Sequence, residues 1–294
     1  MNGAAEIEMQ RWARGLRLAK VVWLTVPCLL ALGGVLWLRG ASFYVLPLAA
    51  RVDHADYAWL SPSRPAGRAY GVVALLLIAL NLGYLLRRRF PHWPLGRMRL
   101  WLDLHVFTGM TAALFVAFHA AFQLRSPVAR ATAATLALTV LSGIVGRFFH
   151  LLAPSEARAL APRIAALEAL APGITAPLCA ALDASLPRAE PPVRGLVRVL
   201  GRLPGWWRCA RTRRARVRAT IEAHLAALPA PERAWARPLA RELSVLAGRE
   251  VHALAGSALR RAWRPWHRTC ALLMVGGILL HVAVALFYGY GGAR

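Results

Sequence analysis

The 294-residue chain has few acidic residues and almost no lysine. Asp and Glu total 13, against 37 Lys plus Arg, and Lys20 is the one lysine. Charged residues make up 17% of the sequence, while 58% is hydrophobic. A disordered basic tail is excluded, because such segments are poor in apolar residues. The mean hydropathy of +0.45 and several long uncharged runs exclude an ordinary soluble domain.

Motifs for zinc, covalent haem and nucleotides are also missing. The four cysteines form no C-x-x-C, so neither a zinc ribbon nor a thioredoxin-like site is expected. Without C-x-x-C-H, covalent attachment of c-type haem is excluded. Neither G-x-G-x-x-G nor a P-loop occurs, which argues against a nucleotide site.

Five apolar runs have the length that a bilayer requires. They predict an all-α integral membrane protein whose transmembrane helices lie at about 21–38, 70–86, 100–124, 131–152 and 266–290. No small-residue cleavage site follows the first run, which we interpret as a retained helix rather than a signal peptide.

The positive charges predict the orientation of these helices. Basic residues cluster before the first run and in the 87–99 loop, whereas the 39–69 loop dilutes its arginines with Asp53 and Asp56. Since cytoplasmic loops carry excess Lys and Arg, we expect a multi-pass protein of the bacterial inner (cytoplasmic) membrane. Its N-terminus would be cytoplasmic and its C-terminus periplasmic.

The sequence predicts three regions. Residues 1–152 hold the first four transmembrane helices, 153–265 form a small cytoplasmic helical insertion, and 266–294 contain the fifth helix. Apolar residues recur at helical spacing in 155–170, 211–227 and 231–262. Between 151 and 262, 18 arginines face 8 acidic residues, a net charge of +10.

Four histidines form two pairs with the same spacing. Thirteen residues separate His105 from His119, and thirteen separate His267 from His281. Fourteen steps of about 100° fall about 40° short of four helical turns, so each pair lies on one helix face, about 21 Å apart. The third and fifth transmembrane helices run parallel by their numbering. His105 is then level with His267, and His119 with His281.

Two levels of facing imidazoles predict two stacked b-type haems with bis-histidine ligation. The metal ligands would be His105, His119, His267 and His281, and small residues at Gly109, Ala112, Ala271 and Gly277 would leave room for a macrocycle. Propionates of the inner haem would pair with Arg97, Arg99, Arg264 and Arg268. At the outer haem, Arg125 with Arg130, or Arg51 with Arg64, would do so. Otherwise, histidines in membrane helices serve as interhelical hydrogen-bonding residues.

Three further residues have alternative interpretations. His150 is either an inner ligand in place of His105 or His267, or a polar residue at the membrane boundary. Asp103 either pairs with Arg99 or receives a proton near the inner haem. Met274, midway between His267 and His281, is expected to pack rather than to ligate.

The paired histidines resemble the transmembrane core of ferric reductases and NADPH oxidases. That resemblance implies that His105 and His267 hold one haem, and His119 and His281 the other. The stretches LDLHVFTG and LSGIVGRFFH are also similar to bacterial membrane cytochromes of this type that lack a fused dehydrogenase. Because the sequence ends shortly after the fifth run, no flavin or nicotinamide domain is expected.

We therefore expect transmembrane electron transfer from a cytoplasmic-side or quinol donor to a periplasmic-side acceptor. The chain would be an oxidoreductase component that needs separate donor and acceptor proteins or quinone. One alternative is a quinol-oxidising cytochrome b subunit of a respiratory complex, with Asp103, His150 or Arg147 lining the quinone site. The other is a non-redox scaffold or transporter, in which the basic stretch 206–220 docks on membrane lipid or an acidic partner. That stretch is otherwise a solvated helix face. Nucleic acid is not an expected partner.

Overall fold

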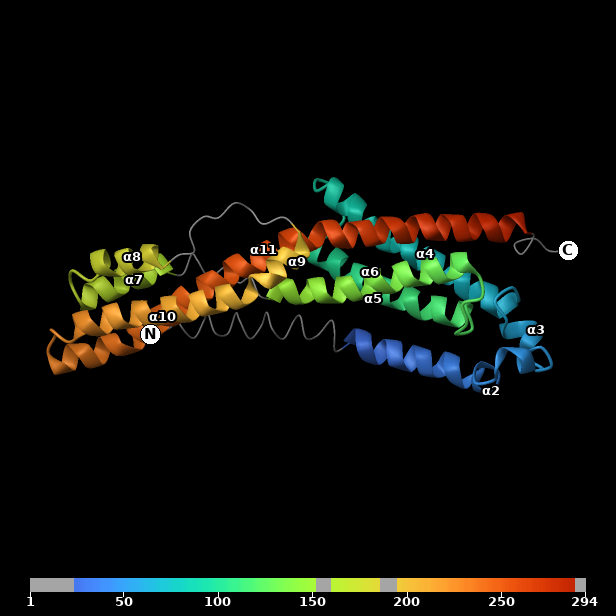
Figure 1. The fold of residues 1–294 in the computed structure, drawn as a ribbon, viewed down its shortest axis with the longest axis horizontal. Coiled ribbons are helices and arrows are strands. Elements are labelled where there is room, and N and C mark those ends of the chain that lie inside the picture. Colours follow the sequence, from blue (N-terminus) through green and yellow to red (C-terminus); the bar gives the residue numbers. More distant parts are fainter. Residues whose placement is uncertain (1–23, 152–159, 186–194, 289–294) are drawn as a thin grey trace. The chain divides into compact units, whose positions relative to one another are not determined.

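The computed structural model describes residues 24–151, 160–185 and 195–288, and every regular element in these ranges is a helix (Figure 1). Within the helices, the side chains of Arg99, Phe148, His150 and Leu151 lie outside the description. The chain divides into two compact units. Unit 1 comprises Met1–Leu141 and Cys270–Arg294, and unit 2 comprises Ser142–Thr269.

Unit 1 is built from long apolar helices joined by short ones. It contains the helix Leu24–Leu38, then α2 (Ala41–Tyr44), η1 (Leu48–Arg51), α3 (Tyr57–Leu60), α4 (Pro65–Arg89), α5 (Met98–His119), the first part of α6 (Pro127–Leu151) and the last part of α11 (Ala230–Phe287). Leucines such as Leu76 and Leu272 are exposed on these helices. A bilayer would cover such side chains.

Among the described residues, four helices are long and apolar enough to cross a membrane. They lie in Tyr57–Arg89, Leu100–His119, Pro127–Arg147 and Ala230–Phe287. Several such helices in an all-helical chain agree with a multi-pass membrane protein. The predicted first transmembrane helix, 21–38, is described from Leu24 to Leu38 as a shorter apolar helix, and 21–23 lie outside the described residues.

Helices α4 and α6 begin four or five residues before the predicted positions, and two larger differences concern α5 and α11. Helix α5 ends at His119, five residues earlier than expected, because a backbone cap closes it there. Helix α11 runs from Ala230 to Phe287 without a break at Pro265, although the sequence suggested two helices, 231–262 and 266–290. Proline inside a membrane helix is tolerated where neighbouring groups hold the helix. Here the Trp263 indole N–H, two residues before Pro265, donates to the Ser142 carbonyl at 2.7 Å.

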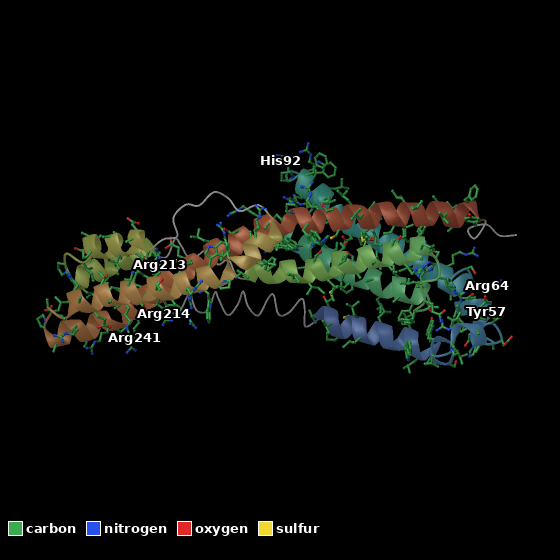
Figure 2. The ribbon with its side chains drawn as sticks, in the orientation of Figure 1. Tyr57, Arg64, His92, Arg213, Arg214 and Arg241 are labelled. Atoms are coloured by element: carbon green, nitrogen blue, oxygen red, sulfur yellow. The ribbon has the colours of Figure 1, made fainter. Side chains whose placement is uncertain are left out.

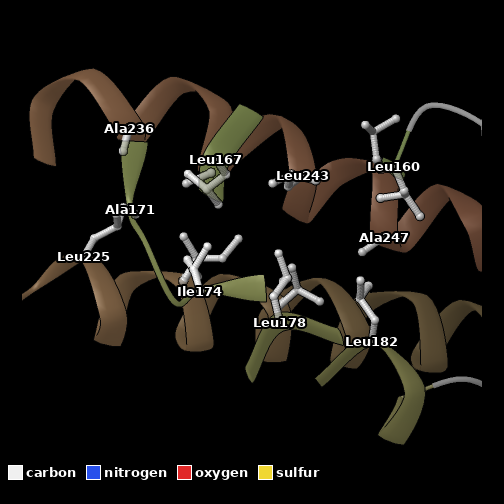
Figure 3. Packing of buried hydrophobic residues seen from close by; sticks show 14 residues of the cluster. Leu160, Leu167, Ala171, Ile174, Leu178, Leu182, Leu225, Ala236, Leu243 and Ala247 are labelled. Atoms are coloured by element: carbon white, nitrogen blue, oxygen red, sulfur yellow. The ribbon is translucent and has the colours of Figure 1, made fainter. Parts of the chain in front are cut away.

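Unit 2 is a helical unit with its own apolar core. Its elements are α7 (Leu160–Leu170), α8 (Thr175–Ala184), α9 (Leu196–Gly201), α10 (Leu203–Leu225) and the part of α11 up to Thr269. Figure 3 shows Leu167, Ile174 and Leu178 packed between α10 and α11, and all three are fully buried. Each such side chain contributes about 1.5–3 kcal/mol by leaving water. Pro204 lies in the first turn of α10, where proline favours helix initiation rather than breaking the helix.

Arg213 is the one charged side chain among the most deeply buried described residues of unit 2, at 1% exposure. It donates to the Ala247 carbonyl at 3.0 Å and to the Leu182 carbonyl, and it pairs with the Glu250 carboxylate at 2.6 Å. Its neighbour Arg214 on α10 is exposed (Figure 2). Part of the basic charge of this segment is therefore structural.

Candidate functional site

His119 lies in the last turn of α5, against two glycines of α4. Its Nδ1 is 2.8 Å from the carbonyl oxygen of Gly67. One turn further along α4, a methyl group on Gly71 would lie 2.8 Å from the same Nδ1 and 2.9 Å from Cε1. Gly71 thus leaves the space that the His119 ring occupies, and the Gly67 carbonyl binds the ring, whereas a methyl group on Gly67 would meet the Ser61 carbonyl instead.

The hydrogen bond to Gly67 fixes the tautomer of His119. A carbonyl oxygen only accepts, so Nδ1 carries the proton, and Nε2 keeps its lone pair. An imidazole that ligates a metal through Nε2 typically donates its Nδ1–H to such an acceptor, which orients the ring and raises its basicity. His119 is therefore held in the form that a metal ligand requires.

His281 of α11 faces His119. The two ring centroids are 6.2 Å apart, and the ring planes cross at 83°. Two imidazole nitrogens bound on opposite sides of one metal ion, at about 2 Å each, separate their ring centroids by about 6 Å. No hydrogen bond among the described residues involves the His281 ring, and both rings are half-buried. The separation of the two rings is thus that of two imidazoles that hold one metal ion.

Helices α5 and α11 face each other at a second level within unit 1, in addition to the level of His119 and His281. Ala112 and Met274 lie seven residues before His119 and His281, and both belong to one buried cluster with Ile78 and Leu136. Met274 is thus a packing residue, as expected. On both helices, this apolar layer precedes the histidines by about two turns.

Two of the small residues expected to leave room for a macrocycle instead allow close helix packing. A methyl group on Gly109 would lie 3.1 Å from the Asn81 amide nitrogen, and one on Gly277 would lie 2.9 Å from the Thr132 hydroxyl. Side chains of α4 and α6 thus occupy the space beside these glycines. Their role in the structure is interhelical contact.

His105 is also fastened to α4, through Asn81. Its Nδ1 is 3.3 Å from the Asn81 carbonyl oxygen, and the Asn81 side-chain amide donates to the His105 carbonyl at 2.6 Å. The same amide reaches the Thr108 hydroxyl at 3.1 Å. Asn81 is the polar residue of an otherwise apolar helix stretch, a signal that the sequence offers but that histidine spacing does not reveal.

His267 belongs to unit 2 and is held by α6. The Ser142 hydroxyl lies 2.8 Å from its Nδ1, and the Trp263 ring stacks on it with centroids 5.0 Å apart. Because His105 belongs to unit 1, the predicted second pair of ligands stays a prediction from sequence spacing. The side chain of His150, the alternative inner ligand, lies outside the described residues.

The predicted propionate partners of the inner haem are exposed wherever they are described. Arg97 precedes α5, and Arg264 and Arg268 lie on the unit 2 part of α11. The side chain of Arg99, the fourth partner and the predicted pair of Asp103, is outside the description. These assignments stay predictions.

Arg51, considered as a partner of the outer propionates, has a structural role instead. It is 3% exposed and donates to the carbonyl oxygens of Tyr44 at 2.6 Å, Leu46 at 2.9 Å and Ala121 at 2.8 Å. Burial, and then the charge of Arg125, lower the pKa of Arg51, but a guanidinium remains protonated. Its three hydrogen bonds join the loop before α3 to the end of α5.

That end of α5 is an unusual cap. Ala121 and Phe122 have φ values of 47° and 60°, and their N–H groups donate to the carbonyls of Phe118 and Ala117, both at 3.0 Å. These two bonds define a Schellman cap, which usually takes glycine. Left-handed non-glycine residues cost about 1–3 kcal/mol each and persist only where their surroundings hold them. The Arg51 bond to Ala121 supplies such a restraint two residues after His119.

In the part of the chain that the structure describes, no group of three or more His, Cys, Asp or Glu side chains gathers as a metal site. A bis-histidine haem needs only two protein ligands, so this result does not bear on the His119–His281 pair. Comparison with known proteins adds no relative: no family model, no curated protein and no solved structure matches this chain.

Proposed function

We propose that this protein is a membrane cytochrome b that transfers electrons across the bilayer through two b-type haems. His119 and His281 hold one haem in this proposal. His105 and His267, matched by their equal spacing in the sequence, hold the second. The helix Leu24–Leu38 completes a bundle of five transmembrane helices in the bacterial inner membrane, with the N-terminus cytoplasmic and the C-terminus periplasmic.

The facing pair of His119 and His281 carries this proposal. At a centroid separation of 6.2 Å the two imidazoles would hold one haem between them, and the Gly67 carbonyl keeps His119 in the tautomer whose Nε2 lone pair could bind its iron. Hydrocarbon disfavours uncompensated imidazoles, so two of them facing each other in membrane helices require a purpose.

When bound, haem supplies reversible one-electron reduction and oxidation of its iron. The protein controls the environment of that reaction. The Gly67 carbonyl raises the basicity of His119, and Phe118, the residue before His119, belongs to an aromatic cluster. Phe118, Phe122 and Tyr44 form the centre of this cluster, with ring centroids 5.1–5.5 Å apart. Ligand basicity and low local polarity are two of the means by which proteins set haem potentials.

In this proposal, the electrons reach the haems from a separate donor. A separate reductase or a quinol on the cytoplasmic side would supply them, and a periplasmic-side acceptor would remove them. The protein therefore acts as a component of a larger redox system.

Haem quantitation and a reduced-minus-oxidised spectrum of the purified protein test the proposal. The expected result is two b-type haems per chain. His119→Ala and His281→Ala should each remove the same haem, whereas His92→Ala, in the exposed loop after α4 (Figure 2), should remove none. Protein without a Soret band, or two histidine variants with unchanged spectra, would overturn the proposal.

A further inference from the structure

A short stretch of unit 2 exposes apolar side chains to its surroundings. In α9 and the first turns of α10, Val197 is 83% exposed, Trp207 54% and Leu200 41%. The alternating residues of the same stretch, including Val199, Leu203 and Trp206, pack inward. Scattered apolar residues on a surface are ordinary, but a local group of this kind marks a contact surface.

Exposed arginines accompany these apolar side chains. Arg198, Arg208 and Arg211 are all exposed, and no Asp or Glu occurs between residues 195 and 221. The Arg211 guanidinium lies 3.7 Å from the centroid of the Trp207 ring. Such a pair places an apolar ring beside a cation that can extend toward a phosphate group. Amphipathic side chains at a membrane interface lie in this way, with the apolar part toward the acyl chains and the charge toward the headgroups.

The stretch lies next to the end of a membrane-spanning helix. Trp206 packs in a cluster with Phe149 of α6 and Leu259 of α11, all within unit 2. Phe149 comes two residues after Arg147, where the apolar part of α6 ends. The contact therefore places the start of α10 at the height where hydrocarbon gives way to headgroups.

We propose that residues 196–211 lie in the membrane interface and bind anionic phospholipid. Val197, Leu200 and Trp207 insert into the boundary between headgroups and acyl chains, about 5–10 Å deep. Arg198, Arg208 and Arg211 bind the phosphate groups. An acidic protein would neutralise the arginines, but a lipid surface also covers the apolar side chains, so the combination favours lipid. This inference does not depend on haem.

Site-specific labelling in nanodiscs tests the position of the stretch. After replacement of the native cysteines, Val197→Cys or Trp207→Cys carries an environment-sensitive fluorophore. We expect quenching by nitroxide placed near the headgroup end of the acyl chain, and protection from a water-soluble quencher. Ala219→Cys is the matched control, since Ala219 is exposed on the same helix, about 18 Å further along its axis. It should show the opposite pattern.

The role of the arginines is tested by charge removal. In discs with anionic lipid, Arg198, Arg208 and Arg211 are replaced together by Gln. The affinity of the stretch for lipid should fall by about five-fold for each arginine, and quenching by the lipid nitroxide should weaken accordingly. The control replaces Arg218, Arg237 and Arg241, three exposed arginines elsewhere in unit 2, and should have little effect. If labels at Val197 and Trp207 are as accessible to water as the Ala219 label, or if both triple variants behave alike, the inference is wrong.

Discussion

Replacing Gly71 by Ala should disturb the proposed haem ligand His119 from the neighbouring helix. The new methyl group would lie 2.8 Å from Nδ1 and 2.9 Å from Cε1, whereas ordinary contacts begin at 3.4 Å. Since the methyl is fixed to the α4 backbone, the imidazole must move by about 0.6 Å, a shift that overpacked sites also force. That movement strains the 2.8 Å hydrogen bond to Gly67.

The size of the effect follows from opposing contributions. Overpacking costs about 1–3 kcal/mol, and a weakened hydrogen bond adds up to about 1 kcal/mol. Alanine in a helix interior recovers about 0.5–1 kcal/mol relative to glycine. The net loss is about 0–3.5 kcal/mol, and its middle value of about 2 kcal/mol corresponds to haem release that is about 30-fold more favourable.

Transfer of haem to an apo-globin acceptor measures this change, and potentiometric titration reports whether the ligand field changes with it. Gly276→Ala is the control, because a methyl group there meets nothing within 4 Å and lies on the same helix as His281. Equal haem retention in Gly71→Ala and the wild type, with His119→Ala losing haem, would refute the idea that α4 positions the ligand.

Three further results are expected. Arg51→Met should destabilise the cap after α5 by about 1–3 kcal/mol, because left-handed backbone loses its restraint; an unchanged unfolding midpoint in detergent would contradict this. Glu250→Ala should cost about 3–5 kcal/mol, because it leaves the buried Arg213 charge without its partner, and thermal unfolding measures the loss. Hydrogen bonds, first from the Thr175 hydroxyl, hold the pKa of Glu168 below its usual 4.5, so its stabilising contribution is complete above pH 4.5 and declines as the pH falls toward the lowered pKa. Glu168→Gln should remove that acid-side decline, and melting curves at pH 7 and pH 4 would show a smaller difference than in the wild type.

The membrane character of this protein could be predicted from composition, because hydrocarbon demands long uncharged helices wherever it is crossed. Part of unit 2 was predictable for a similar reason, since apolar spacing at 3.6 residues is a local property. It indicated α7, most of α10 and the first part of α11, but not α8, α9 or the start of α10 at Leu203, and 155–159 of the first predicted helix lie outside the described residues. The continuation of α11 through Pro265 was not, because it depends on contacts from α6 that the sequence of α11 does not contain.

The candidate site shows the same division. Equal spacing identified His119 and His281 as facing residues on parallel helices. It did not identify Gly67, Gly71, Asn81 or Ser142, which hold the rings, because each lies 24 to 125 residues away in sequence. The sequence offered Arg51 as one alternative partner of the outer propionates, but its burial and its three bonds to backbone carbonyls were visible only in the structure.

By itself, the sequence determined which segments are apolar and helical and which imidazoles share a helix face, because these properties follow from periodicity along one chain. Only the tertiary structure decided how the His119 ring is oriented, where α5 ends and which arginines are structural. Those outcomes depend on hydrogen bonds and close contacts between helices, and such contacts have no fixed separation along the chain. The +24 charge illustrates both levels: its sign and distribution are written in the sequence, but its use differs between buried Arg51 and Arg213 and exposed Arg211.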